Sequence, residues 1–276
     1  MIAHTNPAEH VGLILAGAGA TVLYGIGWLR SATRPPRPIA CWAAGITTVL
    51  VATAPTVEQM AQRSFTGHMV QHLLLIVVAA PLIVFADPVG VARRSGWVGQ
   101  HTTSTERAVA RRWRSSGAFP AAGLFLATLY LTHLTPVYDA ALTDRMLHDV
   151  EHVAYLGSAV ILWAALRRGR RRSAVARTGA VFAVIAGSAL LGMVLLAAST
   201  PLMPTYASRL GGGALADQRR AASLMWVGGM ATTLPLLLFS VWSWASTEQR
   251  IAERSESLSD ARARGAGTGS NASVGR

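Results

Sequence analysis

Long apolar runs separated by short polar segments recur along most of the chain. Most of these runs are long enough to cross a hydrocarbon layer of about 30 Å as a helix. The regular alternation of apolar and polar residues that a membrane β-barrel needs is absent, so helices are expected. The pattern predicts an all-α polytopic membrane protein, a seven-transmembrane-helix bundle with spans near residues 11–29, 39–53, 69–86, 119–134, 148–166, 178–199 and 223–245.

The C-terminal segment has a different composition. Residues 1–246 are predicted to form one transmembrane domain, whereas residues 247–276 are polar and rich in Ser, Gly and Arg. Such a segment cannot bury enough apolar surface to offset the entropy of ordering it. We therefore expect a disordered cytoplasmic tail.

The basic residues fall mainly on one side of the predicted spans. All 25 are Arg, and the seven-span arrangement puts 20 of them on one face and 5 on the other. Because basic residues gather in cytoplasmic loops, the N-terminus is expected outside the cell and the C-terminus inside. The same arginines account for the net charge of +12. They would meet the anionic headgroups of the lipid bilayer, and no nucleic acid is needed as a partner.

Seven of the eight histidines fall on the predicted outer side, and five of them lie at helix ends of similar depth. His68 and His72 begin the third span, His148 and His152 begin the fifth, and His133 closes the fourth. Residues four apart project from one helix face, so each pair could ligate a single metal ion. Taken singly, each ring could instead be a packing residue or reach headgroup water.

Other polar and sulfur-containing side chains near this face could complete a metal site. Asp149, Glu151 and Gln71 flank the two pairs, and carboxylates commonly hold the non-ligating N–H of an imidazole. Asp217 and Met225 are candidate oxygen and thioether ligands. Because thioethers suit Cu(I) and imidazole suits copper generally, copper is favoured over zinc or magnesium, with its oxidation state left open.

Four segments resemble, in order, the polytopic CtaG family of bacterial cytochrome c oxidase assembly factors. They read HMVQHLLL, THLTPVYDAAL, LHDVEHVAYL and DQRRAASLMW, and the resemblance covers roughly residues 11–245. It implies a multi-pass protein of the bacterial plasma membrane that helps to build a haem-copper terminal oxidase by supplying copper on the outer side. The implied partners are an oxidase subunit and an extracytoplasmic copper chaperone, and a homodimer is left open.

Two other functions stay open on the residues alone. A b-type membrane cytochrome would hold haem between two axial histidines such as His72 and His152. A copper transporter would need a polar path through the inner half of the membrane, where the spans offer little beyond Thr, Ser and Cys41.

A retinal protein is excluded because the chain has no Lys to form a Schiff base. A di-metal oxygenase or hydrolase would need more paired carboxylates, so no enzyme is expected.

Overall fold

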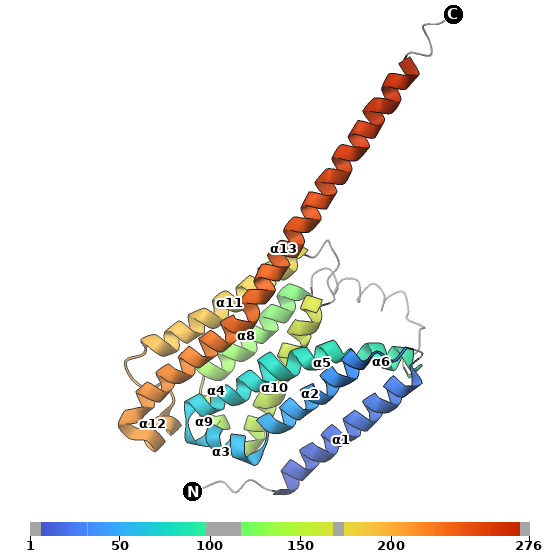
Figure 1. Cartoon of the computed structure of the whole chain (residues 1–276). Coiled ribbons are helices and arrows are strands. Elements are labelled where there is room, and N and C mark those ends of the chain that lie inside the picture. Colours follow the sequence, from blue (N-terminus) through green and yellow to red (C-terminus); the bar gives the residue numbers. More distant parts are fainter. Residues whose placement is uncertain (1–6, 32, 98–116, 168–173, 271–276) are drawn as a thin grey trace, which may run out of the picture.

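The computed structural model describes residues 7–31, 33–97, 117–167 and 174–270 (Figure 1). All regular structure in these residues is helical, which confirms the predicted all-α class. The N-terminal half contains, in order, α1 (Pro7–Arg30), α2 (Pro36–Ala52), α3 (Pro55–Arg63), α4 (Phe65–Leu73), the π-helical segment η1 (Leu74–Ala79), α5 (Ala80–Ala86) and α6 (Pro88–Arg94). The C-terminal half contains α8 (Ala118–Leu134), α9 (Val137–Ala141), α10 (Arg145–Arg167), α11 (Ala174–Ala197), α12 (Pro204–Leu210), the 3-10 turn η3 (Gly211–Gly213) and α13 (Ala214–Ser270).

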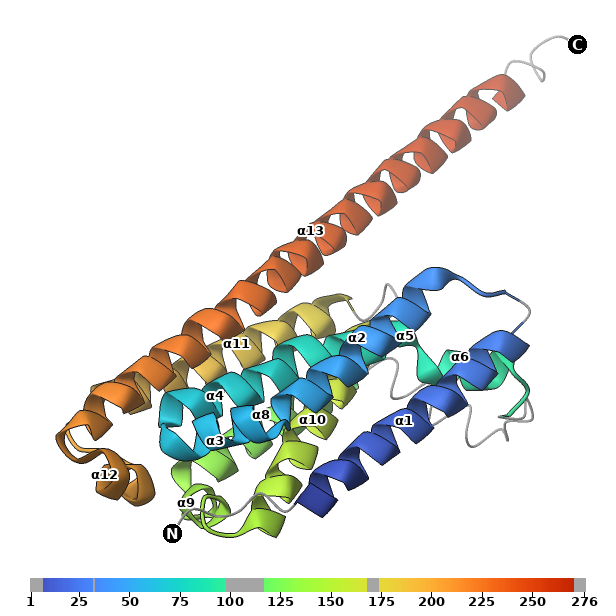
Figure 2. The same cartoon turned by 60° about the horizontal axis from the view of Figure 1, so that its bottom comes forward.

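The long helices form a bundle with α4 and α5 near its middle. α1 and α2 lie at one edge, and α11 and α13 lie at the opposite edge (Figure 2). α8 and α10 pack against each other between these edges, and α10 also packs along η1 and α5. α3 and α13 pack against α4 from two sides. This arrangement brings α4 and the N-terminal part of α10, which carry the two histidine pairs, to the same part of the bundle.

Several helices in the described residues could cross a membrane. Four segments are long and apolar enough, namely Val11–Arg30, Phe65–Arg94, Arg145–Arg167 and Val175–Ala197. A fifth is obtained when the bent pair Pro36–Ala52 and Pro55–Arg63 is counted as one broken span. Ala118–Leu134 is a shorter apolar helix, and the seventh predicted span lies within α13. The count of seven and the orientation of the termini stay predictions.

The last helix extends well beyond the bundle. α13 is continuous from Ala214 to Ser270 and projects away from the other helices (Figure 1). It runs through most of the segment for which the sequence predicts a disordered tail. Ala, Glu and Arg are frequent there and favour helical backbone even without packing partners. The domain boundary at residue 246 stays a prediction.

Candidate metal centre

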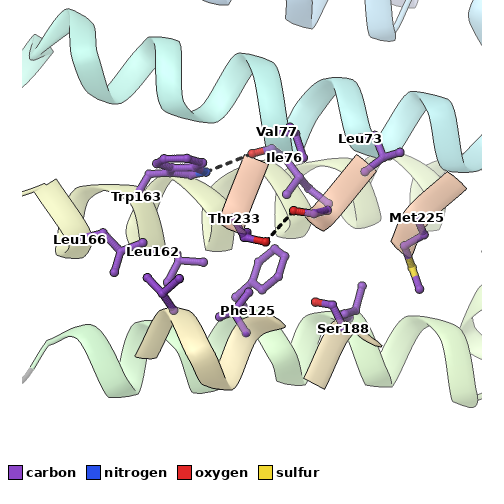
Figure 3. A pocket seen from close by; sticks show the side chains of 14 residues that line it. Leu73, Ile76, Val77, Phe125, Leu162, Trp163, Leu166, Ser188, Met225 and Thr233 are labelled. Carbon is purple, nitrogen blue, oxygen red and sulfur yellow. Dashed lines mark hydrogen bonds between the residues drawn. The ribbon is translucent and has the colours of Figure 1, made fainter. Parts of the chain in front are cut away.

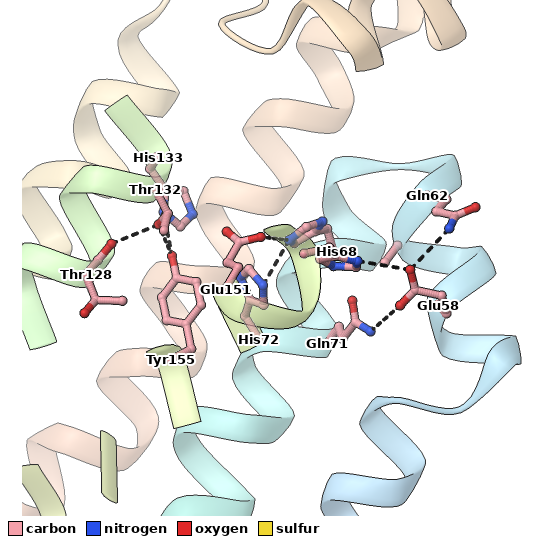
Figure 4. Close-up of polar contacts among 12 residues, drawn as sticks. Glu58, Gln62, His68, Gln71, His72, Thr128, Thr132, His133, Glu151 and Tyr155 are labelled. Carbon is pink, nitrogen blue, oxygen red and sulfur yellow. Dashed lines mark hydrogen bonds and ion pairs between the residues drawn. The ribbon is translucent and has the colours of Figure 1, made fainter. Parts of the chain in front are cut away.

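Helices α4 and α10 bring a set of metal-ligating side chains together inside the bundle. One donor atom from each of His68, His72, His148 and Glu151 lies within 4.8 Å of the others. Figure 4 shows the side chains of His68, His72 and Glu151 close together. All four side chains are buried. These four residues are called the histidine centre below.

The spacing inside the histidine centre fits a shared ion. The Nε2 atoms of His68 and His72 are 2.9 Å apart, and Glu151 Oε2 is 3.7 Å from His68 Nε2. Metal–nitrogen bonds of about 2.0–2.1 Å allow two ligating nitrogens to lie up to about 4 Å apart. The two rings of α4 therefore already stand at a separation that one ion could bridge.

Unpartnered polar atoms are concentrated at and beside the centre. Among the described residues, buried atoms without a hydrogen-bond partner include His72 Nδ1, His148 Nε2, His152 Nε2, His133 Nε2 and both carboxylate oxygens of Glu151. Leaving a buried donor or acceptor unpaired costs about 1–3 kcal/mol each, and native proteins avoid it. A bound cation would satisfy several of these atoms at once, so the donor set fits a metal.

Polar groups outside the histidine centre contact the Nδ1 atoms of two of its rings, those of His68 and His148. His148 Nδ1 lies 3.1 Å from Glu58 Oε1. His68 Nδ1 lies 3.4 Å from the hydroxyl of Tyr206, which donates its own hydrogen to the Ala61 carbonyl. With a hydrogen on Nδ1, each neutral ring presents a bare Nε2, which is the tautomer that a metal needs.

Three buried tyrosines surround the histidine centre. The Tyr155 ring packs against His72 with centroids 4.3 Å apart, and the Tyr138 ring lies 4.9 Å from His68. Burial raises the pKa of both Tyr138 and Tyr206, which lie outside the candidate spans, well above the ordinary range. These two phenols therefore stay neutral and act as fixed dipoles beside the centre.

The other two predicted histidines lie at its margin. The His152 ring is 4.3 Å from His148 and 5.7 Å from His72 between centroids. His133 lies against Tyr138 and Tyr155. Its Nδ1 is 2.9 Å from the Leu129 carbonyl. Neither residue belongs to the set whose donor atoms lie within 4.8 Å of one another.

Asp217, which the sequence predicts as a metal ligand, instead hydrogen-bonds to the start of α4. One carboxylate oxygen accepts a 2.7 Å hydrogen bond from the backbone N–H of Phe65. The other accepts from the Thr66 hydroxyl at 2.6 Å. Because Phe65 begins α4, Asp217 satisfies amide groups that have no partner within that helix. It anchors the histidine-bearing helix to α13.

Met225 lies in an apolar region next to the histidine centre. It lines a cavity of about 80 Å³ between α4, η1, α8, α10, α11 and α13 (Figure 3). The cavity begins at Leu73, which directly follows His72, and continues past Phe125 to Trp163. Most of its lining side chains are apolar, and none is a histidine.

Glu58 is the important residue that the sequence reasoning missed. It lies in α3, a segment that falls between the second and third predicted spans. The available signal is the spacing of the apolar residues Val57, Met60 and Ala61 in PTVEQMAQR, which is typical of an amphipathic helix. That spacing identifies a helix face, but it does not indicate which neighbour the face contacts.

Comparison with known proteins gives one family and several relatives. The family model described as "Cytochrome c oxidase caa3 assembly factor (Caa3_CtaG)" matches residues 22–247, a range that includes all four motif segments. Proteins described as uncharacterized are similar to the chain: those of Mycobacterium bovis and Mycobacterium tuberculosis are 24% identical over 272 residues, and that of Mycobacterium leprae is 26% identical over 273. Each alignment covers 89% of this chain but only 41% of the relative's length. No solved structure matches the chain.

Proposed function

Because the chain belongs to the cytochrome c oxidase caa3 assembly factor family, we propose that it binds copper at the histidine centre and passes it to a subunit of a haem-copper oxidase. The observation that carries the proposal is the gathering of three imidazoles and one carboxylate within 4.8 Å, all buried. Copper is the cargo in this account, and the role of the protein is delivery without catalysis.

The donor set favours one form of copper. The histidine centre offers nitrogen and oxygen atoms, and Met225 lines the neighbouring cavity instead of joining the set. Thioether and thiolate ligands select Cu(I), whereas imidazole and carboxylate ligands suit divalent ions. The proposal therefore takes Cu(II) as the bound form.

Release of the ion needs ligands that can be exchanged. His133 and His152 each have a buried Nε2 without a hydrogen-bond partner in the described structure. Together with the centre they offer more imidazoles than one ion uses. We propose that the ion can pass between these rings on its way to the oxidase subunit.

Delivery on one side of the membrane is better supported than transport across it. Leu73, Ile76 and Val77, which follow His72 along α4 and η1, line the apolar cavity, so an ion moving from the centre along these helices would meet few polar groups. An ion leaving its ligands there would enter a region with few polar groups, which is strongly unfavourable.

A b-type cytochrome is also less well supported. Haem between His72 and His152 would need a flat space separating their rings, and other rings already lie against both. Tyr155 is 4.3 Å from His72, and His148 is 4.3 Å from His152, between centroids.

The topology and partners complete the proposal. Seven spans with an outside N-terminus would place the histidine centre near the outer face of the bacterial plasma membrane, within reach of an extracytoplasmic copper chaperone. One chain supplies all four donors, so a homodimer is not needed to form the site. The chain spans only 41% of the length of the mycobacterial relatives. The partners are therefore proposed for this chain alone and not for those longer proteins.

The proposal is tested in cells that depend on this protein for oxidase assembly. The oxidase would be purified from cells producing the wild type or the His68→Ala/His72→Ala double variant, and its copper and haem contents measured. We expect the variant to yield oxidase with normal haem and strongly reduced copper, restored in part by excess copper in the medium. Normal copper in oxidase from the variant, at equal abundance of the assembly factor, would contradict the proposal.

A further inference from the structure

A buried carboxylate outside the histidine centre contacts one of its ligand rings. We infer that Glu58 is a positioning residue, which holds the Nδ1–H of His148 so that Nε2 faces the histidine centre. This inference rests on the proposed copper site, and it names a residue that neither the motif segments nor the four-residue donor set contains.

The geometry fixes the direction of the hydrogen bond. Glu58 Oε1 and His148 Nδ1 are 3.1 Å apart, and both side chains are buried. A carboxylate only accepts, so the hydrogen between them belongs to the ring. The neutral ring then has its lone pair on Nε2, which is buried without a hydrogen-bond partner in the described structure. A carboxylate behind the imidazole is the usual arrangement around ligating histidines in metal sites.

Glu58 is itself held by two amide groups. Gln62 Nε2 donates to Glu58 Oε1 at 3.2 Å, and Gln71 Nε2 donates to Oε2 at 3.0 Å. Gln71 also donates to the Ala52 carbonyl at 2.9 Å, where α2 ends. Because Gln71 directly precedes His72 on α4, the same network links Glu58 to the helix that carries the other two ligand rings.

The bend of the chain before α3 brings this carboxylate inside the bundle. α2 and α3 meet at 49°, with Ala54 in an extended conformation and Pro55 starting α3. Proline is well suited to the first turn of a helix, where its missing N–H has no partner to lose. The bend turns α3 against α4. It thus places an acidic residue beside the imidazoles in a bundle whose other interior side chains are mainly apolar.

A double-mutant cycle separates positioning from a merely structural role. Cu(II) affinity would be measured by chelator competition, and thermal unfolding in detergent would be followed, for the wild type, Glu58→Gln, His148→Ala and the combined variant. We expect Glu58→Gln to weaken Cu(II) binding by about 10- to 100-fold. In the His148→Ala background the same change should have almost no further effect, because Glu58 acts through that ring.

Spectroscopy and matched variants complete the test. The electron paramagnetic resonance spectrum of the Cu(II)-loaded Glu58→Gln protein should differ from that of the wild type. Glu253→Gln, which removes an exposed carboxylate on α13, should change neither the spectrum nor the affinity. If Glu58→Gln does not fold, Gln62→Leu loosens the carboxylate and keeps its charge, and it should still weaken Cu(II) binding several-fold.

The possible results distinguish failure of the positioning role of Glu58 from failure of the proposed copper-binding function. Wild-type affinity in Glu58→Gln, or in Gln62→Leu where only that variant folds, would overturn the positioning role alone. An equal loss in both backgrounds of the cycle would make Glu58 a structural residue and also overturn it. A wild type that binds no Cu(II), or that binds it unchanged after His68→Ala/His72→Ala, would overturn the proposed function and this inference together.

Discussion

His72 differs from the two other ligand rings of the histidine centre in what holds it. The Nδ1 atoms of His68 and His148 face Tyr206 and Glu58, respectively, whereas His72 Nδ1 has no hydrogen-bond partner in the described structure. Its ring is held by packing against Tyr155 and by a 2.9 Å hydrogen bond between its Nε2 and His68 Nε2. At the scale of single residues, the site thus combines two rings held at Nδ1 by groups outside the centre with one that has no partner at Nδ1 in the described structure.

The sequence predicts Asp217 as a metal ligand, whereas in the structure it caps α4, and a substitution can distinguish these two roles. Asp217→Ala removes the acceptors for the first amide of α4 and for the Thr66 hydroxyl. Loss of such a cap costs about 0.5–2 kcal/mol. We expect a lower midpoint of thermal unfolding with Cu(II) stoichiometry retained. Asp217→Asn, which keeps one accepting oxygen, should lose less stability, and loss of all bound Cu(II) in a folded Asp217→Ala protein would contradict the capping role.

The sequence predicts which histidines form pairs on a helix face, but it does not predict which side chains from other helices contact them. Four-residue spacing puts His68 and His72 on one face of one helix, and the same holds for His148 and His152, whatever the rest of the fold is. The contact between Glu58 and His148 could not be predicted, because it joins α3 to α10 across 90 residues. It depends on the bend at Ala54 and on how the helices pack.

At the scale of elements, the corner between α3 and α4 allows very little space. Ser64 caps α4 by accepting from the Gly67 N–H at 3.0 Å, which explains why this helix begins at Phe65, before the predicted start of the span. A Cβ atom on Gly67 would lie 2.3 Å from the Met60 carbonyl oxygen. The two helices can approach this closely only because residue 67 has no side chain.

Gly67→Ala should therefore open this corner. Overpacking of a tight contact costs roughly 1–3 kcal/mol, and we expect a clear drop in the thermal unfolding midpoint. Because α3 carries Glu58, weaker Cu(II) binding should accompany it. Gly123→Ala on α8 is the matched control, since its added Cβ meets nothing within 4 Å. Equal stability of the two alanine variants would refute the close-approach argument.

The π-helical segment that follows α4 has its own supporting contact. Trp163 Nε1 donates to the Ile76 carbonyl at 3.2 Å (Figure 3). A π-helical turn disturbs the regular hydrogen bonds of an α-helix, and the indole supplies a partner from α10. The sequence predicts an uninterrupted helix over 69–86 and gives no sign of this turn, because η1 is apolar throughout.

Trp163→Phe removes this hydrogen bond and keeps an aromatic ring. We expect a loss of about 0.5–1.5 kcal/mol, the usual net contribution of one hydrogen bond, measured by thermal or chemical unfolding in detergent. Trp226→Phe alters a more exposed indole on α13 and should cost less. An unchanged unfolding midpoint in Trp163→Phe would mean that the indole does not support the π-helical segment.

At the scale of the whole molecule, apolar periodicity predicts which segments are helices, but it does not predict how they are arranged. The Phe65–Arg94, Arg145–Arg167 and Val175–Ala197 segments follow from the third, fifth and sixth apolar runs. The polar helix α3 could not be predicted as part of the bundle interior. Its polar composition predicts a segment between two spans, whereas its position against α4 depends on the packing of the helices.

The proposed orientation can be tested by labelling cysteines from outside intact cells. With Cys41 changed to Ser, Thr143→Cys lies at the end of the bundle predicted to be outer, and Arg34→Cys lies at the end predicted to be inner. Both positions are exposed. A maleimide that cannot cross membranes should label Thr143→Cys in intact cells and Arg34→Cys only after lysis. The reverse pattern would invert the topology and place the histidine centre on the cytoplasmic side.

Metal analysis of the purified protein tests the central claim most directly. After loading with Cu(II) and removal of free metal, the wild type should retain about one copper ion per chain, as expected for a single four-donor site. His68→Ala/His72→Ala should retain none above background, and Met225→Leu should match the wild type because its sulfur lies in the apolar cavity. Equal copper in the wild type and the double-histidine variant would contradict the claim that the histidine centre binds copper.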